Sequence, residues 1–273
     1  MTEIITVYLL ALFNYALARS MQPPLMAFLN HSDITRSNHA GHKIPYLGGL
    51  TPLFGVAGGL YLAALLLPVK REAALLLVAA MIMGGVGFLD DLWGGDSKGF
   101  RGHISALMRQ RKMTTGFVKA VGGGLTAFAA AVIYSSIPWV VVVNTLMIAL
   151  TTNFLNLMDL RPGRALKLFF FVGVLLLLIP GPFLPKGLIW LIIAPALVFF
   201  PWDLSGEAML GDVGANILGV LLGLTMMWAL PEMLKVALVA LLVALHWYGE
   251  KVSFTRVIEG NNLLNRLDRL GRD

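Results

Sequence analysis

Long apolar runs separated by short polar segments make up most of the 273-residue chain. A helix needs about 20 apolar residues to cross the hydrocarbon core of a bilayer, although about 17 suffice. Runs of this kind predict about nine membrane-spanning helices. They lie near residues 3–19, 47–67, 73–90, 117–136, 138–155, 166–180, 185–200, 212–229 and 232–247. We therefore expect an all-α fold, a polytopic transmembrane bundle of about nine or ten spans.

The chain shows no internal repeat and no soluble domain, so residues 1–273 are expected to form a single integral membrane domain. Residues 248–273 differ, because they are polar and carry apolar side chains at helical spacing. They are predicted to form a cytoplasmic tail that lies on the membrane surface as an amphipathic helix. The apolar start, Met1 to Ser20, lacks a basic leader and is interpreted as a retained first span.

Composition agrees with a membrane protein, since 58% of the residues are hydrophobic and only 13% are charged. Soluble domains have about a quarter of their residues charged. The net charge of +6 fits basic segments beside membrane spans. Nucleic acid binding is not indicated, because the aromatic residues are not interleaved with the basic loops. The absence of cysteine excludes disulfides, iron–sulfur clusters and thiolate metal sites.

The positions of Lys and Arg predict the orientation of the bundle. One side of it carries only Lys70, Arg71, Lys186 and Lys235 of the 21 such residues. Cytoplasmic loops carry the excess of basic residues in membrane proteins. The other side is therefore expected to be cytoplasmic, with the N-terminus outside and the C-terminus inside; its segments are 20–46, 91–116, 156–165, 201–211 and 248–273.

Two adjacent carboxylates, Asp90 and Asp91, end the third apolar run on the expected cytoplasmic side. Such groups at the end of an apolar helix repel each other and are costly to desolvate unless a cation accompanies them. Mg²⁺ is the usual partner, because it takes a few carboxylate oxygens together with substrate phosphates. The alternative is a pair of solvated acids at a helix end.

Three further polar groups fall on the same side. Asn153, Asn156 and Asp159 have the spacing that aligns side chains along one side of a helix. Asp212 stands among glycines that allow a ligand close to the backbone, or it is an ordinary N-cap. Lys43 precedes the second run, either as a cation for a phosphate or as a snorkelling side chain. Their convergence on one face predicts a shared site.

Basic residues follow these acids along the chain: Lys98, Arg101, Arg109, Arg111, Lys112, Lys119, Arg161, Arg164 and Lys167. A metal held by carboxylates and surrounded by Lys and Arg suits a polyphosphate. Some of these residues also serve topology and binding to lipid head groups. His103 and His246 are candidates for proton transfer or for structural roles.

At these residues the sequence resembles the polyprenyl-phosphate N-acetylhexosamine-1-phosphate transferase superfamily, bacterial glycosyltransferase family 4. The segment Lys43 to Gly49 is similar to the family's proline–glycine–glycine segment, and Phe88 to Asp91 to its aspartate-rich motif. Asn153 to Asp159 is similar to the Asn-x-x-Asn-x-x-Asp motif, and Gly211 to Gly214 to the Gly-Asp-x-Gly motif. The four segments occur in the family's order and span nearly the whole chain.

The resemblance implies transfer of a sugar-1-phosphate from a UDP-N-acetylhexosamine to undecaprenyl phosphate, with release of UMP and dependence on Mg²⁺ or Mn²⁺. It implies that Asp212 and Asp91 hold the metal, that Asp90 or Asp91 acts on the lipid phosphate, and that Lys43 offsets phosphate charge. It also implies a bacterial inner membrane protein with its site facing the cytoplasm, in cell-envelope synthesis, and by analogy a homodimer. The expected substrate-binding residues are Asn153, Asn156, Asp159, Arg161, Arg164, Lys98, Arg101 and His103.

Two departures from the family pattern concern the donor. Pro162 replaces a carboxylate that the family associates with nucleoside recognition, and the family's last histidine cluster is reduced to His246. Two other readings therefore stay open: a non-catalytic relative that binds lipid phosphate, and a transporter or lipid flippase. Transporters place acids near the middle of the bilayer, whereas these acids lie at the ends of predicted spans.

Overall fold

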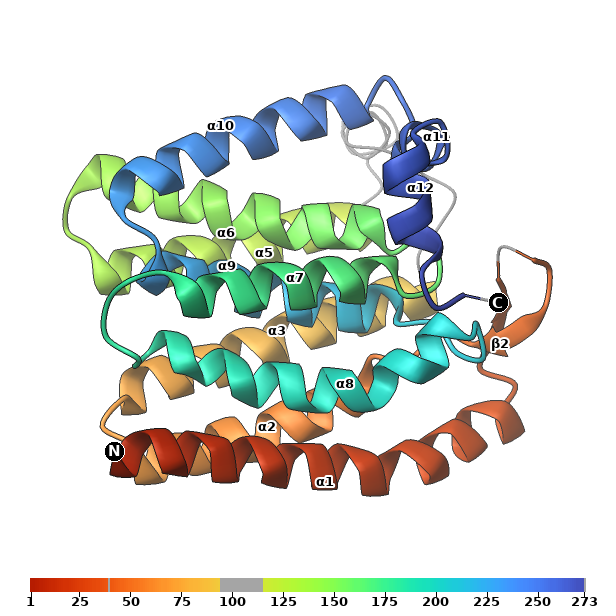
Figure 1. Cartoon of the computed structure of the whole chain (residues 1–273), viewed down its shortest axis with the longest axis horizontal. Helices are drawn as coiled ribbons and strands as arrows, with labels where there is room; N and C mark the ends of the chain where they lie inside the picture. Colours follow the sequence, from red (N-terminus) through yellow and green to blue (C-terminus); the bar gives the residue numbers. More distant parts are fainter. Residues whose placement is uncertain (39, 94–114, 273) are drawn as a thin grey trace.

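The structure of the chain is a computed structural model that describes residues 1–38, 40–93 and 115–272. Its long helices run side by side in one bundle (Figure 1). They are α1 (Thr2–His31), α2 (Leu50–Leu66), α3 (Lys70–Trp93), α5 (Thr115–Tyr134), α6 (Pro138–Met158), α7 (Arg164–Leu178), α8 (Trp190–Leu204), α9 (Gly211–Ala229) and α10 (Glu232–Gly249). The shorter elements are strands β1 (Thr35–Ser37) and β2 (Lys43–Pro45), the 3₁₀ helix η1 (Lys186–Ile189), and helices α11 (Phe254–Glu259) and α12 (Asn262–Arg269).

Seven helical segments in the described part of the chain are long and apolar enough to cross a membrane. They are α1, α3, α5, α6, α9, α10 and the segment Lys186–Leu204, which joins η1 to α8. The other two helices of the bundle are shorter than these seven segments: α2 has 17 residues and α7 has 15. Each expected apolar run thus contains a helix, and the all-α membrane bundle is confirmed. The number of spans and the placement of the termini stay predictions.

Helix α9 is the most buried of the candidate spans. Glycines let its neighbours approach its backbone closely. A Cβ on Gly219 of α9 would lie 2.6 Å from the Cα of Thr152 on α6. A Cβ on Gly87 of α3 would overlap the backbone carbonyl of Asp212 at the start of α9. Small residues allow such contacts between helices in membranes, and here they bring the end of α3 against the start of α9.

The outer helices α5 and α10 expose apolar side chains along much of their length. Leu125 of α5 is 63% exposed and Val243 of α10 is 50% exposed. Water is a poor solvent for such surfaces. Their exposure is the arrangement that a lipid environment favours.

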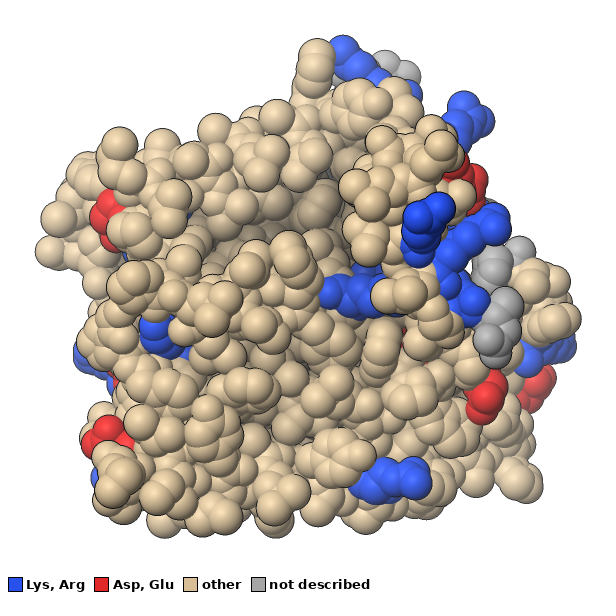
Figure 2. Space-filling view, in the orientation of Figure 1, with Lys and Arg blue, Asp and Glu red and all other residues tan. Residues whose placement is uncertain are grey.

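The polar structure gathers at one end of the bundle. There β1 and β2 form an antiparallel hairpin in which Arg36 pairs with Ile44. The tail helices α11 and α12 lie at the same end, close to the start of α7 (Figure 1). Lys and Arg side chains crowd the tail and hairpin end of the face in Figure 2, whereas the middle of that face is almost free of charge. We refer to this as the polar end.

The tail differs in part from the expected surface helix. It is fastened to the protein through Asp268, which is buried. Leu263, Leu264 and Leu267 of α12 remain exposed. The amphipathic pattern is therefore present, but its polar side is bound to the bundle.

Candidate functional site

A cavity of about 600 Å³ opens at the polar end, where α3 and α6 end and α9 begins. Five predicted site residues line it together: Asp91, Asn156, Asp159, Arg161 and Asp212. The other lining residues come from the hairpin and its flanks, from the loops before α7 and α9, from the end of α8 and from the start of α9: Arg36, Ser37, Asn38, Ile44, Tyr46, Leu160, Pro162, Asp203, Gly206, Ala208, Met209 and Gly211. Acids and amides from separate helices thus face one space. We call it the acidic cavity.

Gly211 allows the segments around the acidic cavity to meet. Its φ of +71° lies in the left-handed region that favours glycine. A Cβ at this position would overlap the backbone carbonyl of Tyr46 and lie 2.9 Å from Oδ2 of Asp91. Glycine is therefore required both by the backbone conformation and by the available space.

Asp91 is held by the start of α9. Only 3% of it is exposed, and its Oδ2 accepts a hydrogen bond of 3.0 Å from the backbone N–H of Val213. A helix N-terminus has free N–H groups and a positive dipole end, so a carboxylate is stabilised there. Arg36 of the hairpin also donates to the backbone carbonyl of Asp91. The capping carboxylate of α9 is thus supplied by α3, whereas sequence reasoning considered Asp212 for that role.

Lys119 of α5 forms ion pairs with both Asp90 and Asp212. Its Nζ lies 2.6 Å from Oδ1 of Asp212 and 3.5 Å from Oδ2 of Asp90. Asp212 lines the acidic cavity, whereas Asp90 reaches this group of residues only through Lys119. Lys119 therefore offsets the negative charges of Asp90 and Asp212, for which the sequence predicted a bound metal cation.

Asp159 and Asp203 are two further carboxyl groups that line the acidic cavity. Burial raises the pKa of Asp159 well above its usual value, and the nearby charges of Asp203, Asp212 and Asp91 raise it further. Asp203 is buried, and its Oδ2 accepts a hydrogen bond of 2.9 Å from the backbone N–H of Gly163. Sequence reasoning missed Asp203, although an acid between Trp202 and Leu204 near the end of an apolar run was a usable signal.

Several expected site residues lie elsewhere or outside the described residues. Asn153 is exposed and does not line the acidic cavity, although Asn156 and Asp159 do. Lys43 is exposed on β2, and the cation that faces the cavity from the hairpin is Arg36. The guanidinium of Arg36 lies 4.4 Å from the ring centroid of Tyr46. Lys98, Arg101 and His103 lie in the segment that the structure does not describe.

The two arginines of the altered third motif have different surroundings. Arg161 lines the acidic cavity, and its Nη2 lies 3.3 Å from Oε1 of Glu259 on α11. The side chains of Arg161 and Glu259 are 31% and 49% exposed, so solvent weakens the pair. Arg161 therefore stays available to an anionic ligand.

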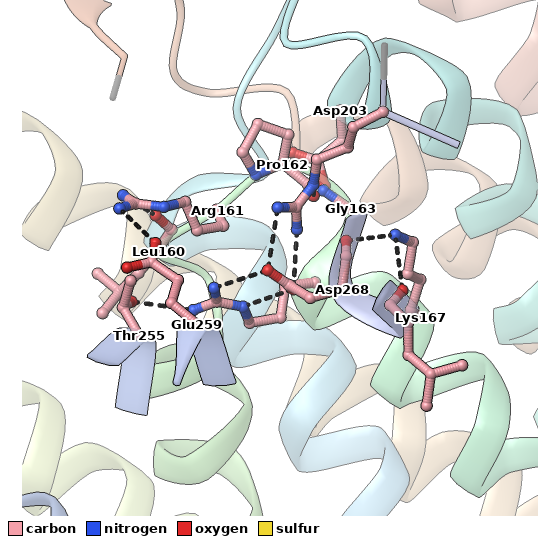
Figure 3. A network of polar contacts seen from close by, with 12 residues as sticks. Leu160, Arg161, Pro162, Gly163, Lys167, Asp203, Thr255, Glu259 and Asp268 are labelled. Atoms are coloured by element: carbon pink, nitrogen blue, oxygen red, sulfur yellow. Dashed lines mark hydrogen bonds and ion pairs between the residues drawn. The ribbon is translucent and has the colours of Figure 1, made fainter. Parts of the chain in front are cut away.

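Arg164 was expected to bind substrate, whereas the structure shows it bound to the C-terminal tail. Its side chain is buried, and it donates two hydrogen bonds to Asp268, of 2.8 and 2.9 Å, and one of 3.1 Å to Thr255 (Figure 3). Arg272 donates to the same carboxylate and, through Nε, to the backbone carbonyl of Pro162 at 2.6 Å. Arg164 thus fastens the tail to the loop that forms one wall of the acidic cavity. We call these contacts the tail clamp.

The tail clamp keeps Asp268 ionised. Burial alone would raise the pKa of Asp268, but hydrogen bonds and charges from Arg164 and Arg272 outweigh it and lower the pKa to about 2. Lys167 adds a hydrogen bond of 2.8 Å to the backbone carbonyl of Asp268. The tail is therefore attached by charged hydrogen bonds, which are stronger than neutral ones.

The donor set of the acidic cavity fits a hard divalent cation. Within the described ranges, no three Asp, Glu or His side chains form a ready metal-binding group. Mg²⁺ needs fewer, because it keeps several waters and takes substrate phosphates as further ligands. Asp91 and Asp212 from neighbouring helices offer carboxylate oxygens, and Asn156 and Asp159 offer oxygens across the same space. Repulsion among these acids favours a cation there.

No model of a known protein family matches the chain, and no curated protein matches it. The fold and the site define a class: an all-α protein with several helices able to cross a membrane and an acidic cavity at one end of the bundle.

Proposed function

We propose that the protein is a Mg²⁺-dependent phosphoglycosyl transferase that moves a sugar-1-phosphate from a nucleotide sugar to a polyprenyl phosphate. UDP-N-acetylhexosamine is the proposed donor, undecaprenyl phosphate the proposed acceptor and UMP the leaving product. One observation carries the proposal: Asp91, Asp159, Asp212 and Asn156, from three separate helix ends, line one cavity at the polar end of an apolar bundle. A water-soluble donor and a membrane-bound acceptor can meet only at such a place.

The reaction exchanges one phosphoanhydride bond for another. An oxygen of the lipid phosphate attacks the β-phosphorus of the donor. The bond from that phosphorus to the bridging oxygen breaks, and UMP leaves with the oxygen. Because all the partners are anions, the barrier depends mainly on charge neutralisation and alignment.

The residues of the acidic cavity divide this work. Asp91 and Asp212 would hold Mg²⁺ or Mn²⁺, which supplies positive charge to the diphosphate when bound. Arg36 and Arg161 bring guanidinium groups to the same cavity, and guanidinium suits phosphate oxygens. Asp91, fixed by the N–H of Val213, orients one side of the site. Asp90 acts through Lys119, whose ammonium it shares with Asp212.

The proposed setting is the inner membrane of a bacterium, in the synthesis of cell-envelope precursors, with the acidic cavity facing the cytoplasm. Nucleotide sugars are cytoplasmic metabolites, so this orientation gives the cavity access to its donor. The excess of Lys and Arg at the polar end supports the orientation.

A donor panel tests the proposal. Purified protein is incubated with Mg²⁺, undecaprenyl phosphate and a series of nucleotide sugars, and release of nucleoside monophosphate is measured. At least one donor should release it, and EDTA should abolish the release. If no donor reacts while an established phosphoglycosyl transferase succeeds in the same assay, a non-catalytic protein that binds lipid phosphate becomes the better account.

The position of the acids weighs against a transporter or flippase. Transporters place their acids near mid-bilayer, where helices are broken. Here Asp91 and Asp203 lie near the ends of α3 and α8, and Asp212 lies in the first turn of α9. In the described helices, these acids therefore gather at one end rather than along a path through the bundle.

A further inference from the structure

A second cavity, of about 460 Å³, lies at the end of the bundle opposite the acidic cavity. It lies where α5 ends, α6 begins, α9 ends and α10 begins, at the left of Figure 1. The acidic cavity lies at the other end of α9, so the two cavities share no lining residue. We call this one the distal cavity.

Buried polar atoms without hydrogen-bond partners gather in the distal cavity. They are Oδ1 of Asn144, Nε1 of Trp228 and Oε2 of Glu232; the hydroxyl of Tyr134, another lining residue, lies by the carboxylate of Glu72. Asn144 is only 2% exposed, although it lies on a helix otherwise dominated by apolar residues. A buried polar atom that lacks a partner is costly, so three such atoms around one space indicate a bound polar group.

The charges of the two ionised residues that line the distal cavity, Glu232 and Lys235, balance. Lys235 is 4% exposed, and its Nζ lies 2.7 Å from Oε1 of Glu232. The pair is neutral as a whole, but it presents a carboxylate oxygen and an ammonium a short distance apart. A ligand that is itself neutral and carries both signs, a zwitterion, complements this pair better than a simple anion or cation does.

The unpartnered atoms specify the two ends of that zwitterion. Asn144 Oδ1 and Glu232 Oε2 accept hydrogen bonds, so they suit a primary ammonium with its three N–H donors. Trp228 Nε1 donates, so with the Lys235 ammonium it suits phosphate oxygens. The rings of Tyr134 and Trp228, whose centroids are 5.6 Å apart, add aromatic surface to the same cavity.

The rim of the distal cavity is apolar and exposed, so it suits the acyl chains of a lipid. Ile137 and Trp139 line the cavity, and each is about half exposed. Trp is enriched where membrane meets water, because its ring is apolar and its N–H is polar. An acyl-bearing ligand can therefore place its head group in the cavity and its chains along the outer surface of α5 and α10.

From these contacts we propose that the distal cavity binds the head group of an ethanolamine phospholipid. The ammonium is bound by Asn144 and Glu232, and the phosphate by Trp228 and Lys235. Phosphatidylcholine is the matched counter-ligand, since its quaternary nitrogen has the same charge and no N–H to donate. The proposal is independent of the transferase activity, because it concerns the opposite end of the bundle.

Native mass spectrometry of the delipidated full chain in detergent tests the proposal. The protein is offered equal amounts of phosphatidylethanolamine and phosphatidylcholine, and the retained lipid is counted. Losing a hydrogen bond to a charged group corresponds to about tenfold in affinity, so we expect about tenfold preference for phosphatidylethanolamine. Glycerophosphoethanolamine, which has the same head group without acyl chains, should not displace it at equal concentration. Displacement would overturn the assignment to a lipid.

Variants locate the binding in the distal cavity. Asn144→Leu keeps the size of the side chain and removes one of the two acceptors, so the preference should fall well below tenfold. Asn216→Leu is the matched control: Asn216 is a buried asparagine of α9 whose amide atoms also lack partners, but it does not line this cavity. It should keep the preference.

Glu232→Gln should weaken the preference as well, and it tests the site if Asn144→Leu fails to fold. Trp228→Phe should weaken the retention of both lipids alike, because it removes a donor to the phosphate that they share. Equal retention of the two lipids by the wild type, or an unchanged preference in the Asn144 and Glu232 variants, would overturn the assignment of an ethanolamine head group to the distal cavity.

Discussion

Asp91 and Asp212 both line the acidic cavity, yet they differ in how firmly they are held. Asp91 is bound by a backbone N–H of α9, which cannot move without moving the helix. Asp212 is bound by the ammonium of Lys119, which stands at the end of a flexible side chain. Lys119 can therefore yield to a metal or to a phosphate, whereas Val213 cannot. Asp212 is the carboxylate best placed to bind an incoming cation.

Asp212→Asn should lower metal-dependent turnover by at least about 100-fold, because an amide supplies no charge to hold Mg²⁺. Turnover is followed as nucleoside monophosphate release, and folding as the thermal midpoint in detergent. Asp33→Asn is the matched control, because Asp33 lies outside the cavity and asparagine tolerates its positive φ of 51°. Full activity in the Asp212 variant would remove this residue from the site.

At the scale of elements, the site depends on how closely α3 packs against α9. Gly87 faces the backbone of Asp212 and Val213, whereas Gly85 of the same helix faces open space. Only the first of these glycines is needed for packing. Substitutions at Gly85 and Gly87 therefore distinguish the effect of helix propensity from the effect of contact between α3 and α9.

Gly87→Ala should destabilise the protein and reduce activity, because its new methyl group would push the start of α9 away from Asp91. Gly85→Ala adds the same methyl group where no atom lies within 4 Å. It should be neutral or stabilise α3 by up to about 1 kcal/mol, since alanine favours helices over glycine. Thermal unfolding and turnover of the two variants provide the comparison. Equal behaviour would contradict the close contact between α3 and α9.

The tail clamp yields a prediction with a pH dependence. Asp268→Asn should cost about 2 kcal/mol at neutral pH, because it leaves Arg164 buried without its carboxylate. The pKa of Asp268 is lowered to about 2 in the folded protein. Its stabilisation is therefore complete above pH 4, where an unfolded aspartate is ionised, and is lost as the pH falls towards 2.

Thermal midpoints of wild type and Asp268→Asn should accordingly differ at pH 7 and converge as the pH falls to about 2. Glu259→Gln is the control within the same tail, because its pair with Arg161 is exposed and should contribute little at any pH. A constant difference between wild type and Asp268→Asn across this range would mean that the clamp does not depend on the charge of Asp268.

At the scale of the whole molecule, the sequence predicted the helices and the meeting of Asp91, Asp159 and Asp212. Membrane helices must satisfy every backbone hydrogen bond internally, so apolar length alone predicts them well. The hydrogen-bond and ion-pair partners of polar residues were harder to predict, because they depend on which distant segments of the chain pack together. Arg36 reached the cavity through a hairpin, and Arg164 was paired by Asp268 from a tail more than a hundred residues later. Neither contact leaves a local signal.

The orientation of the bundle connects the fold to the proposed activity. Single cysteines can report it cleanly, since the chain has none of its own. Lys70, at the start of α3, and Ser37, in the hairpin, are both exposed and lie at opposite ends of the bundle. In intact cells a membrane-impermeant maleimide should label Lys70→Cys, whereas Ser37→Cys should react only after the membrane is permeabilised. This follows from the few Lys and Arg at the end that carries Lys70 and the many at the polar end. The reverse labelling would place the acidic cavity outside the cell, beyond the reach of cytoplasmic nucleotide sugars, and the proposed transferase would lose its donor.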